Sequence, residues 1–236
     1  MDPRRDTVPA AVTFLRDAGL VFRKDLLVEA RGKEVLAPML FFSVIVVFVF
    51  SFGFAGDGAA GADLVSGMLW VGLLLASTIG IGRTFERERE GETFRALLLT
   101  PASRAAVFVG KLMSILVFIA LAEAVVVPLL VVLFGAPLFE HPFRLLALLA
   151  LGTVGLCAIG ALLGATLMRT RGRDVMLAIA LYPLVVPVVL AGSRGTAALL
   201  DHDLAGADLW LRFLLAFDAV FVVLGLWIFE PLVSEA

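Results

Sequence analysis

Long apolar segments separated by short polar ones set the pattern of this chain. Six such segments occur, at about 35–54, 64–82, 107–134, 143–168, 175–191 and 209–229. A membrane-spanning helix requires about 20 mostly apolar residues, and each segment meets or approaches that length. The pattern predicts an all-α polytopic membrane protein whose six transmembrane helices occupy residues 35–229, between an N-terminal segment (1–34) and a C-terminal tail (230–236).

Basic residues are concentrated in alternate polar segments. Seven precede the first apolar segment, six lie in or directly after 83–104, and three lie at 169–173, which is sixteen of the nineteen lysines and arginines. The segments near 55–63 and 135–142 contain none. Because lysine and arginine accumulate in cytoplasmic loops, we expect both termini and the 83–104 segment to face the cytoplasm.

Residues 13–34 show helical periodicity but lack the apolar length to span a membrane. The segment predicts an amphipathic helix along the inner membrane surface, with an apolar arc formed by Phe14, Leu15, Ala18, Val21, Phe22, Leu26 and Val28. Asp25 and Glu29 project from the middle of that arc. Glu29 can pair with Lys33, four residues on, and reach water. The alternative is that Asp25 or Glu29 binds an arginine of the 83–104 segment.

Composition agrees with a membrane class. Of 236 residues, 61% are hydrophobic and 17% are charged, whereas soluble domains average about 45–50% apolar and about 25% charged residues. Cys157 is the single cysteine, so an intramolecular disulfide is impossible and a thiolate metal cluster is not expected. The polar N-terminal segment does not resemble a signal peptide, and the first span is therefore expected to remain as an anchor.

Small residues are frequent in two of the spans. The second contains four glycines, which predict close packing inside the bundle or at a dimer interface: Gly67, Gly72, Gly80 and Gly82. Trp70, toward the outer side of the same span, is expected to be an interfacial anchor. In the fourth span, Gly160 and Gly164 form a small-xxx-small motif that also favours close helix packing.

The fifth span is short and contains Pro183 and Pro187, so we expect a kink there. A short outer helix is predicted around residues 196–200, before an aspartate-rich segment. His141 and His202 both lie on the predicted outer side. Two isolated histidines in such loops are expected to be solvated rather than to bind a metal or heme.

Two carboxylates interrupt the apolar spans. Glu123 lies near the middle of the third span and Asp218 midway along the sixth. An ionisable group inside a membrane is costly unless it is paired or neutral, and it is therefore a candidate functional residue. A protonated carboxyl bonded to a neighbouring helix is the structural alternative. We expect at least one of the two to make a polar contact inside the bundle or across a dimer interface.

The polar segment 83–104, between the second and third spans, is the densest charged stretch of the chain. Arg83 to Glu90 can continue the second helix, and Gly91 is a natural break. A two-turn helix is predicted from Glu92 to Leu99, ending before Thr100-Pro101, which can also cap the next helix. Its apolar face would consist of Phe94, Leu97 and Leu98. Such a helix suits a groove on a partner protein, although a plain hairpin connector is the alternative.

The sequence of this loop, ERERE-GE-T-F-R-A-LLLTP followed by a basic residue and G-K-L, resembles the loop of type-2 ABC-transporter permeases that holds their coupling helix. Further stretches are similar to the cytochrome c maturation protein B family of heme exporter permeases. They are KDLLVEARGKEVLAPMLFF, GMLWVGLLLASTIGIGRTFERERE, EAVVVPLL and FLLAFDAVFVVLGLWIFE. The resemblance covers most of the chain in order and is weakest near 55–63, 136–144 and 192–208.

The resemblance implies a permease subunit of the bacterial inner membrane that works as a homodimer on two cytosolic ABC ATPase subunits. The ATPase-docking residues would be Glu86, Glu88, Glu90, Gly91, Glu92, Phe94, Leu97, Leu98 and Pro101. Further implied partners are heme-handling and small membrane proteins of cytochrome c maturation, a periplasmic heme chaperone and membrane lipids. Nucleic acid is not an expected partner. ATP and Mg would be bound by the ATPase, and heme would be cargo rather than a cofactor of this chain.

Missing motifs limit the chemistry. The chain has no G-x-x-x-x-G-K-[ST] loop, so ATP must be hydrolysed by another polypeptide, and no C-x-x-C-H heme-attachment motif. We therefore expect a non-catalytic subunit that couples ATP hydrolysis elsewhere to heme export or to release of a heme-loaded chaperone. The alternatives are a type-2 permease for a drug or lipid-linked substrate, and a membrane scaffold that transports nothing.

Overall fold

The computed structural model describes residues 10–54, 61–90, 103–167 and 172–234. These residues form α-helices and one 3₁₀ helix and contain no strand, which confirms the all-α prediction. The elements are α1 (Ala10–Gly32), α2 (Leu36–Gly53), α3 (Ala62–Glu90), α5 (Arg104–Phe134), η2 (Leu138–Glu140), α6 (Pro142–Thr166), α7 (Arg173–Leu200) and α8 (Leu204–Ser234). Among the described residues, six helices, α2 to α8, are long and apolar enough to cross a membrane.

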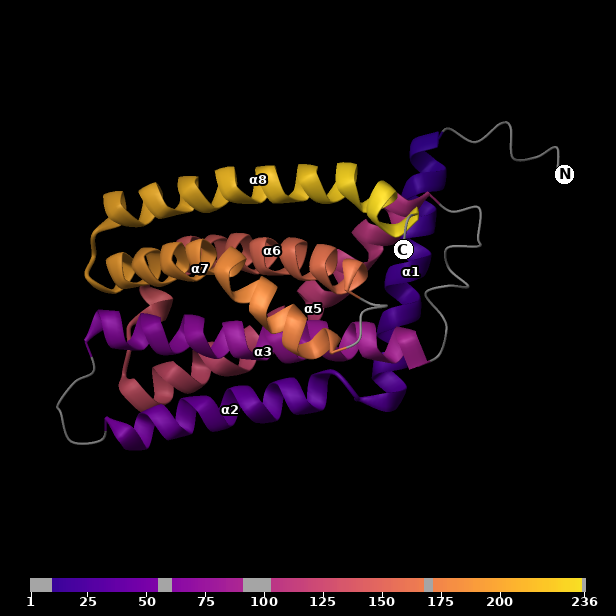
Figure 1. The fold of residues 1–236 in the computed structure, drawn as a ribbon. Coiled ribbons are helices and arrows are strands. Elements are labelled where there is room, and N and C mark those ends of the chain that lie inside the picture. The colour runs from indigo at the N-terminus through magenta and orange to yellow at the C-terminus, as the bar shows by residue number, and fades with distance from the viewer. Residues whose placement is uncertain (1–9, 55–60, 91–102, 168–171, 235–236) are drawn as a thin grey trace, which may run out of the picture.

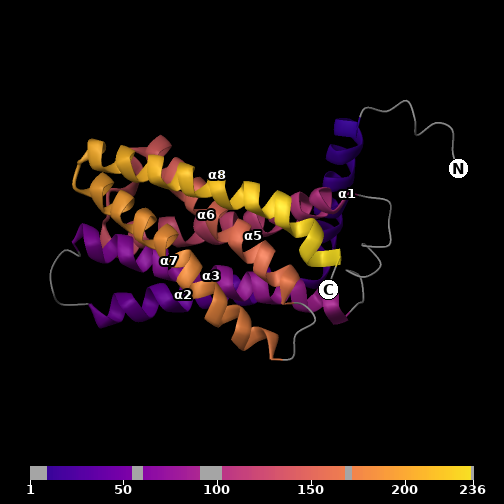
Figure 2. The same ribbon diagram turned by 45° about the horizontal axis from the view of Figure 1, so that its top comes forward.

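One helix lies across the others. Helices α2, α3, α5, α6, α7 and α8 form an elongated bundle, and α1 crosses one end of it (Figure 1, Figure 2). The C-terminal part of α8 reaches the same end. A helix that lies across one end of a membrane bundle has the orientation expected of an interfacial helix. We call this the α1 end, and the sequence predicts it to be cytoplasmic.

The helices are not equally buried. In the spans of α3 and α6 most residues are buried, whereas in those of α2 and α8 only a minority are. Gly160 and Gly164 of α6 face Ile81 and Phe85 of α3, and a methyl group at either glycine would collide with them. The predicted close packing of these small residues is therefore confirmed.

The fifth and sixth spans differ from the prediction at their boundary. No separate helix occurs at 196–200, because α7 continues through Pro183 and Pro187 to Leu200. Figure 1 shows a change of direction along α7. The end of α7 is rich in small residues and packs inside the bundle, with Thr196 fully buried. Helix α8 then begins at Leu204, where Asp203 Oδ1 accepts a hydrogen bond of 2.9 Å from the Gly206 N–H.

Trp70 is not an interfacial anchor, and the prediction for it was wrong. The indole is fully buried, and its Nε1 donates a hydrogen bond of 3.0 Å to Thr196 Oγ1 on α7. The ring occupies the space left by the missing side chains of Gly152 and Gly192. A tryptophan with a satisfied N–H can be a core residue, and no feature within the second span itself pointed to glycines on two other helices.

Candidate functional site: the α1 end of the bundle

Helix α1 packs closely on α5. Gly110 of α5 allows this approach, because a Cβ atom there would lie 2.8 Å from the carbonyl oxygen of Ala18 and 2.7 Å from the Cβ of Val21. Ala18 and Val21 are buried, whereas Leu15 and Val28 are 67% and 43% exposed. The predicted apolar arc is therefore divided. One stripe packs on α5, and the other is open to the surroundings, as an interfacial helix requires.

A buried ion pair joins the same two helices. The Nζ atom of Lys111 on α5 lies 2.6 Å from Asp25 Oδ2, and both side chains are 1% exposed. Lys24 Nζ lies 3.1 Å from the other carboxylate oxygen. Burial alone would raise the pKa of Asp25, but the charges of Lys111 and Lys24 outweigh it and hold the pKa below its ordinary value.

Glu29 has a different role, because it connects α1 to α2. Its buried Oε1 accepts hydrogen bonds from the backbone N–H groups of Val35, at 3.0 Å, and Leu36, at 2.7 Å. A carboxylate at the first N–H groups of a helix satisfies donors that have no partner within the helix. Lys33 lies between the two helices with φ of 54°. The pair predicted between Glu29 and Lys33 does not form, since the carboxylate is turned toward the start of α2.

The structure gives Asp25 a different partner from the predicted arginine of the 83–104 segment. Asp25 pairs with Lys111, seven residues beyond Arg104, and the arginine that we proposed as its partner is replaced by this lysine. The pairing of Glu29 with an arginine of the segment remains a prediction, because Arg95 and the side chains of Arg87 and Arg89 lie outside the described set. The sequence did contain an indication that Lys111 would pair with Asp25. A lysine next to a long apolar run calls for a buried counter-charge, and Asp25 lies in an apolar arc.

The predicted docking residues lie at and beyond the end of α3. This helix continues to Glu90, as expected, and Glu86 Oε2 lies 3.3 Å from Arg83 Nη1. Glu88 and Glu90 are in the last turns of α3, but their side chains are outside the described set. The remaining docking residues also lie outside it: Gly91, Glu92, Phe94, Leu97, Leu98 and Pro101.

Helix α5 begins directly after that segment. Its N-cap is Ser103, whose Oγ accepts a hydrogen bond of 3.2 Å from the Ala106 N–H. This corrects the prediction that Thr100 and Pro101 cap the helix, because Ser103 lies closer to its start. The first turns of α5 therefore run from the end of the predicted docking segment to Lys111, which is bonded to α1.

The carboxylates of the spans lie inside the bundle. Glu123 is 8% exposed and accepts a hydrogen bond from Thr153 Oγ1 on α6, which provides the polar contact that the sequence predicted. Asp218 is 5% exposed, and its Oδ1 would contact a methyl group placed on Gly155 of α6. In the part of the chain that the structure describes, neither oxygen of Asp218 has a hydrogen-bond partner.

The opposite end of the bundle brings the two histidines together. The rings of His141 and His202 are 6.2 Å apart and nearly perpendicular, and His202 Nδ1 lies 3.7 Å from Glu140 Oε2. Within the described ranges, no group of three histidine, cysteine, aspartate or glutamate side chains could hold a metal ion. Arg144 and Asp208 join α6 to α8 nearby through two contacts of 2.9 Å and 3.3 Å.

Known proteins similar to this chain match it over most of their own length. "Heme exporter protein B" of Pseudomonas aeruginosa is 29% identical over 87% of this chain and 89% of its own length. The proteins of that name from Paracoccus denitrificans and Rhodobacter capsulatus are each 28% identical, over 78% and 72% of this chain and 83% and 78% of theirs. The family model described as CcmB protein matches residues 17–231. The match includes most of α1 and all six apolar helices, and the chain therefore belongs to the CcmB family.

Proposed function

We propose that this chain is the membrane permease subunit of an ATP-driven complex for heme delivery in cytochrome c maturation, located in the bacterial inner membrane. Membership of the CcmB family and the name shared by the relatives support the heme-related role. The observation that carries the mechanical part is the buried pair of Asp25 and Lys111. It connects the interfacial helix to α5, directly after the predicted docking segment.

In this proposal, a separate cytosolic ATPase binds the segment around Phe94, and two copies of each subunit form the complex. Closure of the two ATPases moves the segment, and α5 carries that movement to Lys111. Asp25 transmits it to α1, and Glu29 extends it to the start of α2. A set of rigid helices joined by buried polar contacts can move between two arrangements as one unit. This chain would therefore perform no catalysis itself.

The packed interior favours release of a heme-loaded periplasmic chaperone over passage of heme through one copy. Large side chains fill the bundle along its length, including those of Trp70, Phe85, Phe108 and Phe118, all at most 1% exposed. Movement of α5 and α6 can change the opposite end of the bundle without opening a channel in this chain. Heme passage between two copies, or transport of another substrate, is the alternative.

Docking can be tested by charge substitution at the predicted contact. The full chain, membrane-extracted with its ATPase, is compared as Phe94→Glu and as Phe143→Glu, which places the same change on a phenylalanine that is 86% exposed at the opposite end. We expect Phe94→Glu to lower ATPase recovery by about 30-fold, the effect of losing a buried aromatic contact. Phe143→Glu should leave recovery unchanged. Equal recovery with both variants would refute docking at 83–104.

The heme-related role requires a separate assay. Cells that lack the native subunit are supplied with this chain, and covalently bound heme in their c-type cytochromes is measured together with the amount of heme-loaded chaperone. We expect Phe94→Glu to abolish cytochrome maturation and to leave loaded chaperone bound at the membrane. If loaded chaperone does not accumulate while maturation fails, heme movement rather than chaperone release is the step that needs this subunit. Failure of the unmodified chain to restore maturation would contradict the role itself, whereas normal maturation with Phe94→Glu would contradict docking at Phe94.

A further inference from the structure

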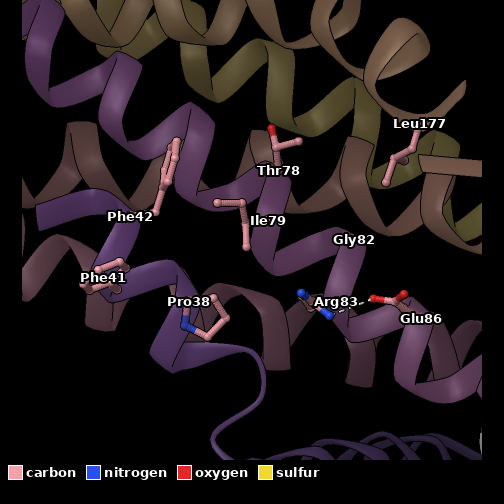
Figure 3. Close-up of a pocket in the computed structure, with 9 residues that line it drawn as sticks. All are labelled: Pro38, Phe41, Phe42, Thr78, Ile79, Gly82, Arg83, Glu86 and Leu177. Carbon is pink, nitrogen blue, oxygen red and sulfur yellow. Dashed lines mark hydrogen bonds and ion pairs between the residues drawn. The ribbon is translucent and has the colours of Figure 1, made fainter. Parts of the chain in front are cut away.

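A laterally open groove lies between α2, α3 and α7, close to the α1 end. Its cavity volume is about 500 Å³, within the range of about 300–1,000 Å³ that is common for ligand sites. Phe41 and Phe42 of α2 line one side, and Ile79 of α3 and Leu177 of α7 line the others (Figure 3). Phe41 is 70% exposed, so this side of the groove is open at the outer surface of the bundle.

The groove is charged at one end only. Arg83 and Glu86 line it at the last turns of the α3 span, which extends over Ala62–Glu86. Phe41 and Phe42 belong to the apolar span of α2. In a membrane, the aromatic walls therefore lie beside the acyl chains, and the charged end lies near the headgroups, where long charged side chains are stable.

The charged end contains one positive and one negative side chain. Arg83 Nη1 lies 3.3 Å from Glu86 Oε2, with the two side chains 57% and 34% exposed (Figure 3). An accessible arginine can bind a phosphate, and an accessible carboxylate can bind an ammonium group. Two opposite charges side by side therefore complement a zwitterionic headgroup better than a purely anionic one.

We propose that this groove binds one phospholipid with a phosphate and a primary ammonium group, the chemistry of phosphatidylethanolamine. The phosphate contacts Arg83, the ammonium group contacts Glu86, and an acyl chain lies along Phe41, Phe42 and Ile79. The lipid fills the space between α2 and α7 on the outer surface of α3. This site requires only that the helices span a membrane and is independent of any role in heme delivery.

A glycine in the groove provides a specific way to block it. Among the described residues, a Cβ atom on Gly82, which lines the groove, would meet no heavy atom within 4 Å, and the same holds for Gly67 near the other end of α3. Gly82→Leu should therefore fill the groove without a clash, and Gly67→Leu is its matched control. Thermal unfolding of both variants verifies that each is folded.

The test is native mass spectrometry of the full chain after reconstitution in equal amounts of phosphatidylethanolamine and phosphatidylglycerol. We expect the unmodified chain and Gly67→Leu to retain one phosphatidylethanolamine with about fivefold preference, the size that one accessible ion pair supplies. Gly82→Leu should lose it. Glu86→Gln should shift the preference toward phosphatidylglycerol, and Arg83→Gln should weaken retention of both lipids. These two variants keep the test decisive if Gly82→Leu does not fold.

Three outcomes would overturn the proposal. The first is equal retention of the two lipids by the unmodified chain, or equal retention by Gly82→Leu and Gly67→Leu. The second is hemin binding that displaces the lipid and is lost only in Gly82→Leu, which would make the groove a cargo site. The third is dissociation of a homodimer by Gly82→Leu alone, measured by light scattering, which would show that a second copy covers the groove.

Discussion

The chain buries acidic side chains in two places, and their surroundings differ. At the α1 end, Asp25 has two cationic neighbours, Lys111 at 2.6 Å and Lys24 at 3.1 Å. In the middle of the bundle, the hydrogen-bond partner of Glu123 among the described residues is the hydroxyl of Thr153. Asp218 is also buried there, and among the residues the structure describes it has no hydrogen-bond partner.

Asp25 therefore joins two helices, whereas Asp218 joins none among the described residues. The buried ion pair of Asp25 and Lys111 holds α1 against α5, and loss of either partner would leave an uncompensated charge. A buried carboxylate without a partner only adds a desolvation cost within one chain. Contacts among the described residues of one copy therefore give no reason for the burial of Asp218, whereas Asp25 is paired with Lys111 between α1 and α5.

The largest expected effect is loss of the buried pair. Lys111→Met should lower the free energy of unfolding by about 3–5 kcal/mol, because Asp25 then loses its closest counter-charge in a buried position. The measurement is unfolding of the full chain in mixed detergent micelles. The double variant Asp25→Leu/Lys111→Met should recover most of the loss, since it removes both charges. A double variant as unstable as the single one would show that packing of Lys111, rather than its charge, stabilises the α1 end.

Low pH should also lower the unfolding free energy, because protonation of Asp25 removes its charge from the pair with Lys111. The pKa of Asp25 is below its ordinary value of 3.8, so its contribution to stability is complete above that pH. The contribution is lost only as the pH falls further, through the lowered pKa of the folded protein. The difference in unfolding free energy between the unmodified chain and Asp25→Asn should therefore be constant at neutral pH and shrink below about pH 4. A difference that shrinks between pH 7 and 5 would mean that another group dominates.

Another buried carboxylate, Glu29, binds backbone N–H groups. Glu29→Ala should lower the unfolding free energy by about 2 kcal/mol, because the N–H groups of Val35 and Leu36 lose their acceptor. Glu29→Gln keeps a carbonyl oxygen in the same place and should lose less than about 1 kcal/mol. Equal losses in the two variants would show that the charge of Glu29, rather than its acceptor geometry, stabilises the turn between α1 and α2.

Much of this architecture was predictable, because membrane spans are determined by local composition. The six apolar helices and the helical periodicity of α1 followed from hydrophobic patterns within single segments. The continuation of α3 to Glu90 followed from the charged stretch that ends at Gly91. The packing of Gly160 and Gly164 against α3 also followed, since small residues at that spacing permit close approach. The boundary of α7 was not predicted correctly. The small residues around Thr196 have low hydrophobicity, so the sequence did not indicate that they form the buried end of α7.

The contacts between distant segments could not be derived in the same way. Asp25 and Lys111 are 86 positions apart, and the sequence indicated only that each was unusual in its surroundings. Trp70 bonds to Thr196 across 126 positions, in a space made by glycines of two other helices. Such pairs depend on the relative placement of helices, which hydrophobic periodicity does not specify. The predicted docking side chains from Phe94 to Pro101 stay predictions, since they lie outside the described residues.

The smallest effect is expected at Asp218 and gives the sharpest contrast with Asp25. Asp218→Asn should change the unfolding free energy of the single chain by less than about 1 kcal/mol, because no hydrogen bond within the described chain is lost and the buried charge is removed. The matched variant Glu123→Gln changes a carboxylate that has Thr153 as its partner. A loss above about 2 kcal/mol for Asp218→Asn would reveal a strong partner within one copy. Unchanged stability together with impaired assembly of the ATPase complex would instead place the missing partner of Asp218 on another subunit.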